Sequence, residues 1–227
     1  MPTVVDIADA EPGCVGVYTP HHAGALAGVS GQTIGQWARH GLVTPTVYKG
    51  RPANLYSYFD VAEAIVVRWL LDKHRISHAQ IRFALSRVRD DYPKWPLLHA
   101  PIGIGHQSLD DPGRLVYQHP GGREAYVDVS GEAPDQIVIR PQLLDRARDM
   151  LAHGGWIADD LGLSHIEVDP RKLGGQPSLR DRRWAVDHVA RLAADDEGRE
   201  ILIESYGLDA SEVDEAVAWV DGVEALA

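Results

Sequence analysis

The sequence predicts an α+β protein, mostly α, in which a helical N-terminal part, a small β-rich middle segment and a three-helix C-terminal part follow one another. Three observations indicate this fold. Apolar residues recur at the i, i+3, i+4 spacing of a buried helix face, as between Ile81 and Val88. Short β-prone runs broken by Gly and Pro fill the middle of the chain. Helical spacing then returns between Val213 and Val220.

Length and composition agree with a globular protein. The chain has 227 residues, of which 44% are hydrophobic and 24% are charged, and this length allows one or two domains. A single cysteine, Cys14, excludes an internal disulfide and a cysteine-rich zinc site. No apolar run reaches membrane-spanning length, and the acidic first residues do not resemble a signal peptide. We therefore expect a cytoplasmic protein without membrane contact or cofactor.

The net charge of −11 is unevenly placed along the chain. Residues 18–92 contain nine Lys and Arg against five Asp and Glu, a balance of +4. Residues 93–227 carry −12, and the first 17 residues carry −3. This asymmetry suggests that the first part meets nucleic acid and the rest meets a different partner. Chance variation on a soluble surface is the alternative.

Capping residues locate two short helices near the start. Thr19 can cap a helix with Pro20 in its first position, where the missing N–H has no consequence. Ser30 can cap a second helix that ends at Gly41. The inner stripe of this second helix is formed by Ile34, Trp37 and Ala38. Two β-prone runs around residues 49–52 then predict a hairpin.

Two longer helices follow the hairpin. The stretch from about Asp60 to His74 is apolar nearly all round, which predicts a buried helix. Ser77 and Gln80 form a capping box that opens the next helix, whose outer face is basic.

The pattern changes at Tyr92, where Pro and Gly interrupt it and indicate a boundary. Short strands are expected at 97–104, 114–118, 125–129 and 136–140, with a turn at 119–123 and a helix ending at Gly154. The role of segment 93–164 stays open between dimerisation, partner contact and ligand binding. Trp95 and Trp156 are expected in a core rather than in a pocket.

The last part, residues 165–227, begins with a strand-like stretch and continues as three helices. These are expected at about 184–194, 197–206 and 210–221. Asp209 caps the last of them, with Glu212 at its third position.

Two short helices joined by a tight turn can place the second helix in the major groove of DNA. Gln32, Thr33 and Gln36 are then positioned to reach base edges, and Gln can bond adenine at two points. Lys49 and Arg51 of the hairpin would contact phosphate, which positions the protein without reading sequence. Arg39 and Tyr56 complete the predicted DNA-binding set, which comprises Gln32, Thr33, Gln36, Arg39, Lys49, Arg51 and Tyr56. A protein–protein adaptor that has lost DNA binding is the alternative.

The order of helix, turn, helix, hairpin and two further helices resembles the MerR-type winged helix-turn-helix. The matching residues are AGVSGQTIGQWARHGLV, GRPANLYSYFDVAEA and ISHAQIRFAL, within residues 18–92. Where that family often has a basic residue before the wing tyrosine, this chain has Asn54-Leu55-Tyr56, which implies a weaker grip on phosphate. Because a balance of +4 gives weak binding per monomer, we expect a homodimer on two half-sites.

A second motif lies near the C-terminus. Gly174-Gly175-Gln176-Pro177 requires a tight turn, and Arg180, Arg182 and Arg183 follow it. With ILIESYGLDASEVDEAVAWV downstream, residues 165–227 resemble the domain-of-unknown-function family four hundred thirty-three. That family usually has Gly between its two arginine positions, whereas this chain has Asp181.

This second resemblance implies a VapB-like antitoxin encoded beside a toxin with a PIN-type ribonuclease fold. The toxin-binding residues would be Arg180, Arg182 and Arg183, because guanidinium groups pair bidentately with the carboxylates of such an active site. The alternative is that these arginines hold their own turn to neighbouring acids.

The C-terminal tail is strongly acidic. From Asp195 onward there are eleven acidic residues and one basic residue, Arg199. An acidic helical face could cover the basic groove of an RNA-binding toxin and accelerate association. A solvated helix face explains the same composition.

The sequence therefore predicts a non-enzymatic antitoxin that represses its own operon, with operator DNA and a PIN-type ribonuclease toxin as partners. A MerR-like ligand-responsive transcriptional regulator is the second interpretation. A hydrolase or nuclease in the C-terminal half is the third, although no pair of carboxylates is specified by spacing. No catalytic residue and no metal site are predicted.

Overall fold

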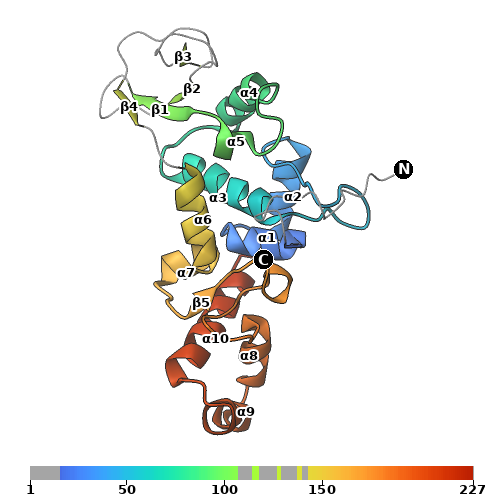
Figure 1. Cartoon of the computed structure of the whole chain (residues 1–227), viewed down its shortest axis with the longest axis vertical. Helices are drawn as coiled ribbons and strands as arrows, with labels where there is room; N and C mark the ends of the chain where they lie inside the picture. Colours follow the sequence, from blue (N-terminus) through green and yellow to red (C-terminus); the bar gives the residue numbers. More distant parts are fainter. Residues whose placement is uncertain (1–15, 107–113, 118–126, 129–136, 140–142, 227) are drawn as a thin grey trace.

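The computed structural model describes residues 16–106, 114–117, 127–128, 137–139 and 143–226. The fold is α+β and mostly α, as the sequence predicts (Figure 1). The molecule is elongated, with a four-stranded sheet at one end and the C-terminal helices at the other. Within the described ranges, no helix is both long enough and apolar enough to cross a membrane.

The elements follow one another in a simple order. The helical elements are α1 (Pro20–Leu26), α2 (Gly31–Arg39), α3 (Tyr58–Asp72), α4 (His78–Val88), α5 (Pro96–His99), α6 (Leu143–Ala152), α7 (Gly155–Leu161), the 3₁₀ turn η2 (Leu173–Gly175), α8 (Val186–Leu192), α9 (Asp196–Glu200), the π-helical turn η3 (Ile201–Ser205) and α10 (Ala210–Glu224). The strands are β1 (Ile102–His106), β2 (Arg114–Tyr117), β3 (Val127–Asp128), β4 (Ile137–Ile139), β5 (Ile166–Glu167) and β6 (Ser178–Leu179).

The strands form two antiparallel sheets. The larger sheet has the order β3-β2-β1-β4, and β5 pairs with β6. In the larger sheet, Ile104 of β1 lies opposite Leu115 of β2 and Ile139 of β4. β1 is therefore an inner strand, and Ile104 is fully buried.

The predicted caps of the first two helices are confirmed. The Thr19 hydroxyl accepts the N–H of His22 at 3.3 Å, and the Ser30 hydroxyl accepts the N–H of Thr33 at 3.2 Å. Gly41 has a φ of +72° where the chain leaves α2. A Cβ at Gly24 would lie 2.7 Å from the carbonyl oxygen of Val29. The glycine thus allows the turn between α1 and α2 to close tightly.

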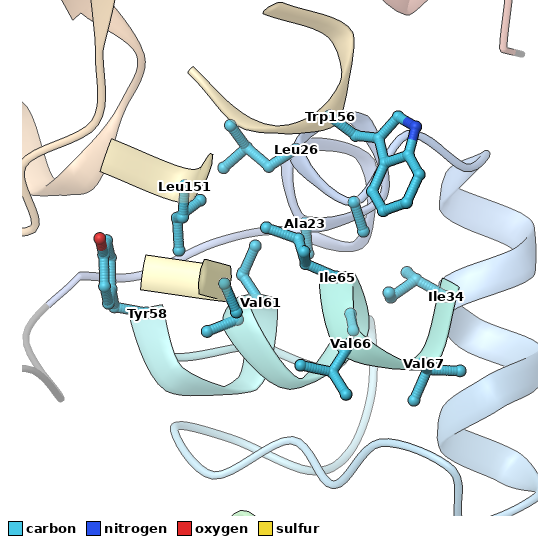
Figure 2. Packing of buried hydrophobic residues seen from close by; sticks show 14 of the residues in the cluster. Ala23, Leu26, Ile34, Tyr58, Val61, Ile65, Val66, Val67, Leu151 and Trp156 are labelled. Atoms are coloured by element: carbon cyan, nitrogen blue, oxygen red, sulfur yellow. The ribbon is translucent and has the colours of Figure 1, made fainter. Parts of the chain in front are cut away.

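The helix α3 is buried, as its apolar sequence predicts, and forms the centre of the first part of the molecule. Val61 and Ile65 of α3 face Ala23 of α1 and Leu151 of α6 (Figure 2). The helix begins at Tyr58, two residues before the expected start at Asp60. The reason is local, because Ser57 caps the helix and its N–H is bonded in return by the Asp60 carboxylate at 2.8 Å.

The predicted strand at 97–104 is wrong in its first half. Residues 96–99 form the helix α5, and β1 begins only at Ile102. Trp95 adopts a left-handed backbone with a φ of +48°, and Pro96 then occupies the first helical turn. Leu97 and Leu98 are buried. Burial of these adjacent apolar residues decides the conformation over β-propensity.

The middle segment packs against the first part of the chain. Trp95 and Trp156 are buried in the common core, as expected. The predicted helix ending at Gly154 is confirmed as α6, whereas α7 was not predicted. The remaining expected strands overlap β2, β3 and β4, and the turn at 119–123 lies outside the described residues. The division of the chain into domains at 18–92, 93–164 and 165–227 stays a prediction.

The C-terminal helices agree with the sequence in order and caps. Asp209 and Glu212 form the expected capping box of α10, and the expected middle helix is α9 continued by η3. The indole N–H of Trp219 donates to the Gly154 carbonyl at 3.0 Å. The N–H of Val17 donates to the Gly174 carbonyl at 3.2 Å. These bonds attach the C-terminal unit to both earlier parts.

Candidate nucleic-acid interface

One face of α2 is turned to solvent and carries polar side chains. Gln32, Gly35, Gln36 and Arg39 share this face because their spacing is i, i+3, i+4, i+7. Gln32, Gln36 and Arg39 are exposed. On the opposite side Ile34 and Trp37 are buried against the core. The structure thus places three of the predicted DNA-binding residues side by side on an accessible helix.

Thr33 lies off this face. Its hydroxyl is 3.1 Å from the Ser30 hydroxyl, and its N–H is the donor capped by Ser30. The side chain is half-buried. Thr33 therefore supports the start of α2, and in this arrangement it is less accessible to a base than Gln32 or Gln36.

The hairpin after α2 presents the two basic residues that were assigned to phosphate. Tyr48 and Leu55 pair through both backbone hydrogen bonds, at 3.2 and 2.8 Å. Lys49 and Arg51 lie in the connecting turn and are exposed. The Tyr48 hydroxyl donates to the carbonyl of Arg51 at 3.0 Å. Lys49 and Arg51 are therefore exposed on a turn that is stabilised by its own hydrogen bonds.

Tyr56 is placed differently from the sequence prediction. Its side chain is fully buried, and burial raises the pKa of its hydroxyl. Its backbone N–H and C=O pair with Tyr18 at 2.9 Å each. The assignment of Tyr56 to DNA contact is therefore corrected, because the side chain belongs to the core that holds the hairpin.

Two carboxyl groups are buried on α3, the helix that follows the hairpin. Asp60 accepts the N–H of Thr46 at 2.8 Å and the indole N–H of Trp95 at 2.6 Å. Burial raises the pKa of Asp60 even though these donors act in the opposite direction. Asp60 thereby joins the start of the hairpin to the segment after residue 92.

The second carboxyl, Glu63, lies one helical turn further along α3 and is fully buried. It accepts the N–H of Leu97 at 3.1 Å. Burial raises the pKa of Glu63 to about 8, with the nearby Asp60 acting in the same direction. Glu63 is therefore mostly protonated at neutral pH.

Not all the positive charge of residues 18–92 is free for a duplex. Arg68 donates to the carbonyl of Gly28, and its guanidinium lies 4.5 Å from the ring centre of Trp156. Arg89 donates to the carbonyl of Gly41 at 2.9 Å. These two arginines bond backbone carbonyls just after the C-terminal ends of α1 and α2. Fewer positive charges are therefore available to contact DNA phosphates than the sequence count of nine suggests.

The end of α10 comes close to the start of α2. A hollow of about 310 Å³ is lined by residues from α1, from the first turn of α2 and from the C-terminal end of α10. Gln32 is on one side of it, with Val223 and Leu226 on the other. Gln32 nevertheless remains exposed. The acidic C-terminal helix thus borders the candidate interface without covering it.

The three C-terminal arginines have different surroundings. Arg182 donates to Glu212 at 2.7 Å and to the carbonyl of Gly207 at 3.0 Å, so it holds its turn to α10. Arg180 is half-buried, and its backbone N–H bonds the carbonyl of His165 at 2.7 Å. Arg183 is exposed and forms no hydrogen bond or ion pair with the part of the chain that the structure describes. Of the predicted toxin-binding set, Arg183 is the most accessible.

Sequence reasoning missed a groove of about 560 Å³ between α3, α6 and α7. Trp69, Met150 and Trp156 contribute to its apolar lining, and Arg146 and Asp159 lie among its polar residues. The guanidinium of Arg146 stands 5.4 Å from the ring centre of Trp69. The groove requires α7 to lie beside α3 and α6, and the sequence after Gly154 did not predict this helix.

The described residues contain no group of three or more His, Cys, Asp or Glu side chains arranged to hold a metal ion. The buried carboxyls Asp60 and Glu63 are engaged by donors from the protein itself. The accessible chemistry of this part of the molecule is therefore hydrogen bonding and charge, presented by α2 and the hairpin.

Comparison with known proteins gives two findings. Residues 166–220 match the model of a family described as Protein of unknown function (DUF433). Among solved structures, the chain is similar to the X-ray crystal structure of Rv2018 from Mycobacterium tuberculosis, with 15% sequence identity and a TM-score of 0.51. That match covers 92% of this chain and 98% of that one, and at this identity it concerns the fold alone. No curated protein matches.

Proposed function

We propose that the protein is the antitoxin of a type II toxin-antitoxin system and that it also binds its own operator as an autorepressor. The observation that carries the proposal is the joining of two features in one chain. The solvent face of α2 presents Gln32, Gln36 and Arg39, and a separate C-terminal unit matches the DUF433 model. Operator DNA and a ribonuclease acting on cellular RNA both belong to the cytoplasm.

In the DNA-binding half, α2 acts as the recognition helix of a MerR-like winged helix-turn-helix. Gln32 and Gln36 read base edges in the major groove, and Arg39 extends the same face. Lys49 and Arg51 of the wing bind phosphate. A homodimer supplies two such heads, which compensates for the modest charge of each.

In the toxin-binding half, the C-terminal unit neutralises a PIN-type ribonuclease encoded by the neighbouring gene, in the manner of VapB-like antitoxins. Arg183 is the arginine best exposed to pair with carboxylates of the nuclease site. Arg182 instead orders the turn through Glu212, and Arg180 contributes only if its half-buried side chain turns outward.

Co-expression with the product of the adjacent reading frame tests this proposal. The two proteins should purify as a stable complex, the complex should not cleave RNA, and the complex or the free antitoxin should retard a fragment of its own promoter. Absence of a complex, or unchanged RNA cleavage in its presence, would overturn the antitoxin assignment. Failure to retard any promoter fragment at low salt would overturn the autorepressor assignment.

A second function is favoured by the groove between α3, α6 and α7, whose volume of about 560 Å³ lies in the range of small-molecule sites. In a MerR-like ligand-responsive regulator, a bound apolar ligand would act on α3, which supports α2. A transporter or detoxifying enzyme in the adjacent reading frame would favour this function. If the protein is such a regulator, a ligand bound in the groove should change its affinity for DNA. Replacing the groove residue Trp69 by Ala should abolish that change.

A further inference from the structure

The end of the molecule furthest from the large sheet carries exposed apolar side chains. Among the described residues, six large apolar side chains are more than a third exposed, and three of them lie between residues 192 and 206. Leu192 is 38% exposed, Ile201 is 43% exposed and Tyr206 is 55% exposed. We call the surface formed by Trp184, His188, Leu192, Ile201 and Tyr206 the distal face. His188 and Leu192 lie on α8, and Ile201 begins η3, which continues α9. The helices α8 and α9 lie at the tip of the C-terminal unit (Figure 1).

The distal face is held in place by its own contacts. The rings of Trp184 and Tyr206 meet edge to face with their centres 5.0 Å apart, and Trp184 stacks on His188 at 5.8 Å. Leu192 follows His188 by one turn of α8. A Cβ at Gly198 would lie 1.9 Å from the carbonyl oxygen of Leu192, so α8 and α9 are in direct backbone contact. The apolar groups are therefore presented by an ordered scaffold.

Exposed acidic residues flank these apolar groups along the chain. Six acids lie between residues 192 and 209, namely Asp195, Asp196, Glu197, Glu200, Glu204 and Asp209. The one basic residue in this stretch, Arg199, is paired with Asp214 at 2.6 Å. Apolar and aromatic anchors inside a charged rim are the usual anatomy of a protein–protein interface.

The charge of the rim selects the partner. Nucleic acid would be repelled by it, and so would the same face of a second copy of this chain. A protein surface rich in Lys and Arg would be attracted, and complementary charge would accelerate its association. A ribonuclease must present such a surface in order to hold the phosphates of its substrate.

We propose that the distal face docks on the basic, RNA-binding groove of the partner ribonuclease, with Leu192, Ile201 and Tyr206 as anchors and the surrounding acids in the place of RNA phosphates. This inference rests on the proposed function and adds a location to it. It predicts inhibition by covering the substrate groove. Arg183 directly precedes Trp184 in the chain, so the exposed arginine of the proposed toxin-binding set adjoins the distal face.

The test is binding of full-length variants to the product of the adjacent reading frame. Ile201→Asp and Tyr206→Ala should each weaken binding by about 10- to 100-fold and restore RNA cleavage in the mixture. Phe83→Ala is the matched control, because Phe83 is also 43% exposed but lies on α4. Unchanged thermal unfolding and promoter binding would show that each variant is folded.

A second set of variants examines the rim. Glu197→Lys and Glu200→Lys should slow association several-fold at low salt and flatten its dependence on ionic strength. If the wild-type protein binds the nuclease but the distal-face variants bind equally well, the docking site is refuted while the antitoxin function stands. If the wild-type protein does not bind at all, the proposed function fails, and the docking site fails with it.

Discussion

At the scale of single residues, Glu63 is a carboxyl group whose protonation is governed by burial. It lies among apolar neighbours of α3 and is fully buried. The Leu97 N–H and the positive charge of Arg89 act to lower its pKa, but burial outweighs them. Burial therefore decides its protonation state, and the raised pKa of about 8 makes the fold sensitive to pH.

This sensitivity has a definite sign. Below the ordinary glutamate pKa of 4.5, Glu63 is protonated in both the folded and the unfolded chain. Between about pH 4.5 and 8 only the folded chain holds the proton, so stability should fall as pH rises through that window, by a few kcal/mol in all. Glu63→Gln should reduce this slope, leaving the part contributed by the raised pKa of Asp60, and should leave the chain more stable at pH 8. Urea unfolding at several pH values measures it, and an unchanged slope in the variant would contradict the assignment.

Substitutions on the α2 face and in the hairpin are predicted to change DNA binding in different ways. Gln32→Ala and Gln36→Ala should reduce discrimination between operator and mutated operator by about 1–3 kcal/mol per lost base contact. Lys49→Ala and Arg51→Ala should weaken binding to all sequences alike and lower the salt dependence. Titrations of both duplexes at two salt concentrations distinguish the two patterns. A uniform loss for the glutamine variants would show that they do not read bases.

Residue-scale prediction succeeded where a side chain acts on its own neighbours in the chain. The caps at Thr19, Ser30 and Asp209 follow from local hydrogen bonding, which the sequence specifies. Tyr56 and Arg182 could not be placed in this way. Their positions depend on Tyr18 and Glu212, which are distant along the chain.

At the scale of elements, α2 contains a glycine that the packing of the described residues does not require. Among the described residues, a Cβ at Gly35 would find a neighbour within 4 Å only in the Arg39 guanidinium, at 3.9 Å. By contrast, a Cβ at Gly31 would lie 3.1 Å from the backbone of His21. Gly31 is thus explained by the packing of α2 on α1, whereas Gly35 lies on the solvent face between Gln32 and Gln36.

Gly35→Ala should therefore stabilise the protein and impair DNA binding. Removing an unneeded glycine from a helix contributes about 0.5–1 kcal/mol to stability. On a face that lies against a duplex, the added methyl group prevents close backbone approach. Thermal unfolding and operator titration measure the two effects separately. Undiminished operator affinity in a stabilised variant would mean that the backbone at Gly35 does not approach DNA.

The junction of α6 and α7 rests on another glycine. Gly155 has a φ of +78°, and a Cβ there would lie 2.5 Å from the carbonyl oxygen of Leu26. Gly155→Ala combines a strained backbone with a backbone overlap and should cost about 3 kcal/mol. Gly162, with a φ of +67° and no atom within 4 Å, is the matched control, and Gly162→Ala should cost about 1 kcal/mol. Equal losses in urea unfolding would show that the close contact with α1 is not essential.

Element-scale prediction was limited by tertiary contacts. The periodic helices α3, α4 and α10 were predictable because each carries its own apolar stripe or continuous apolar surface. The short α5 and α7 have no such stripe. They exist because Leu97 and Trp156 find burial sites on other elements, and those sites are invisible in a local window. The groove beside α7 was missed for the same reason.

At the scale of the whole molecule, Tyr18 joins the first part of the chain to the C-terminal unit. Its backbone pairs with Tyr56, and a Cβ at Gly175 would lie 2.4 Å from its hydroxyl oxygen. The ion pair between His22 and Asp187 at 3.8 Å bridges the same two parts. The basic first part and the acidic C-terminal unit are thus separate in sequence but packed against each other in the fold.

Substitutions at Tyr18 should test this connection. Its hydroxyl is buried without a hydrogen-bond partner in the described residues, so Tyr18→Phe should leave stability unchanged within about 0.5 kcal/mol. Tyr18→Ala should cost about 3–5 kcal/mol, because it removes a buried ring between the two parts. Calorimetry of both variants gives the comparison. A large loss for Tyr18→Phe would reveal a bond made by the hydroxyl.

The nearness of α10 to α2 also provides a place for a reporter group. Glu224 is exposed and lies between Val223 and Leu226, which border the hollow shared with Gln32. A fluorophore on a cysteine introduced at this position, with Cys14 replaced by serine, would lie beside α2 without replacing any residue proposed to contact a base. Its emission would register the arrival of a duplex at α2. The effect of ribonuclease binding at the distal face, at the other end of the C-terminal unit, could then be followed by fluorescence in the same sample.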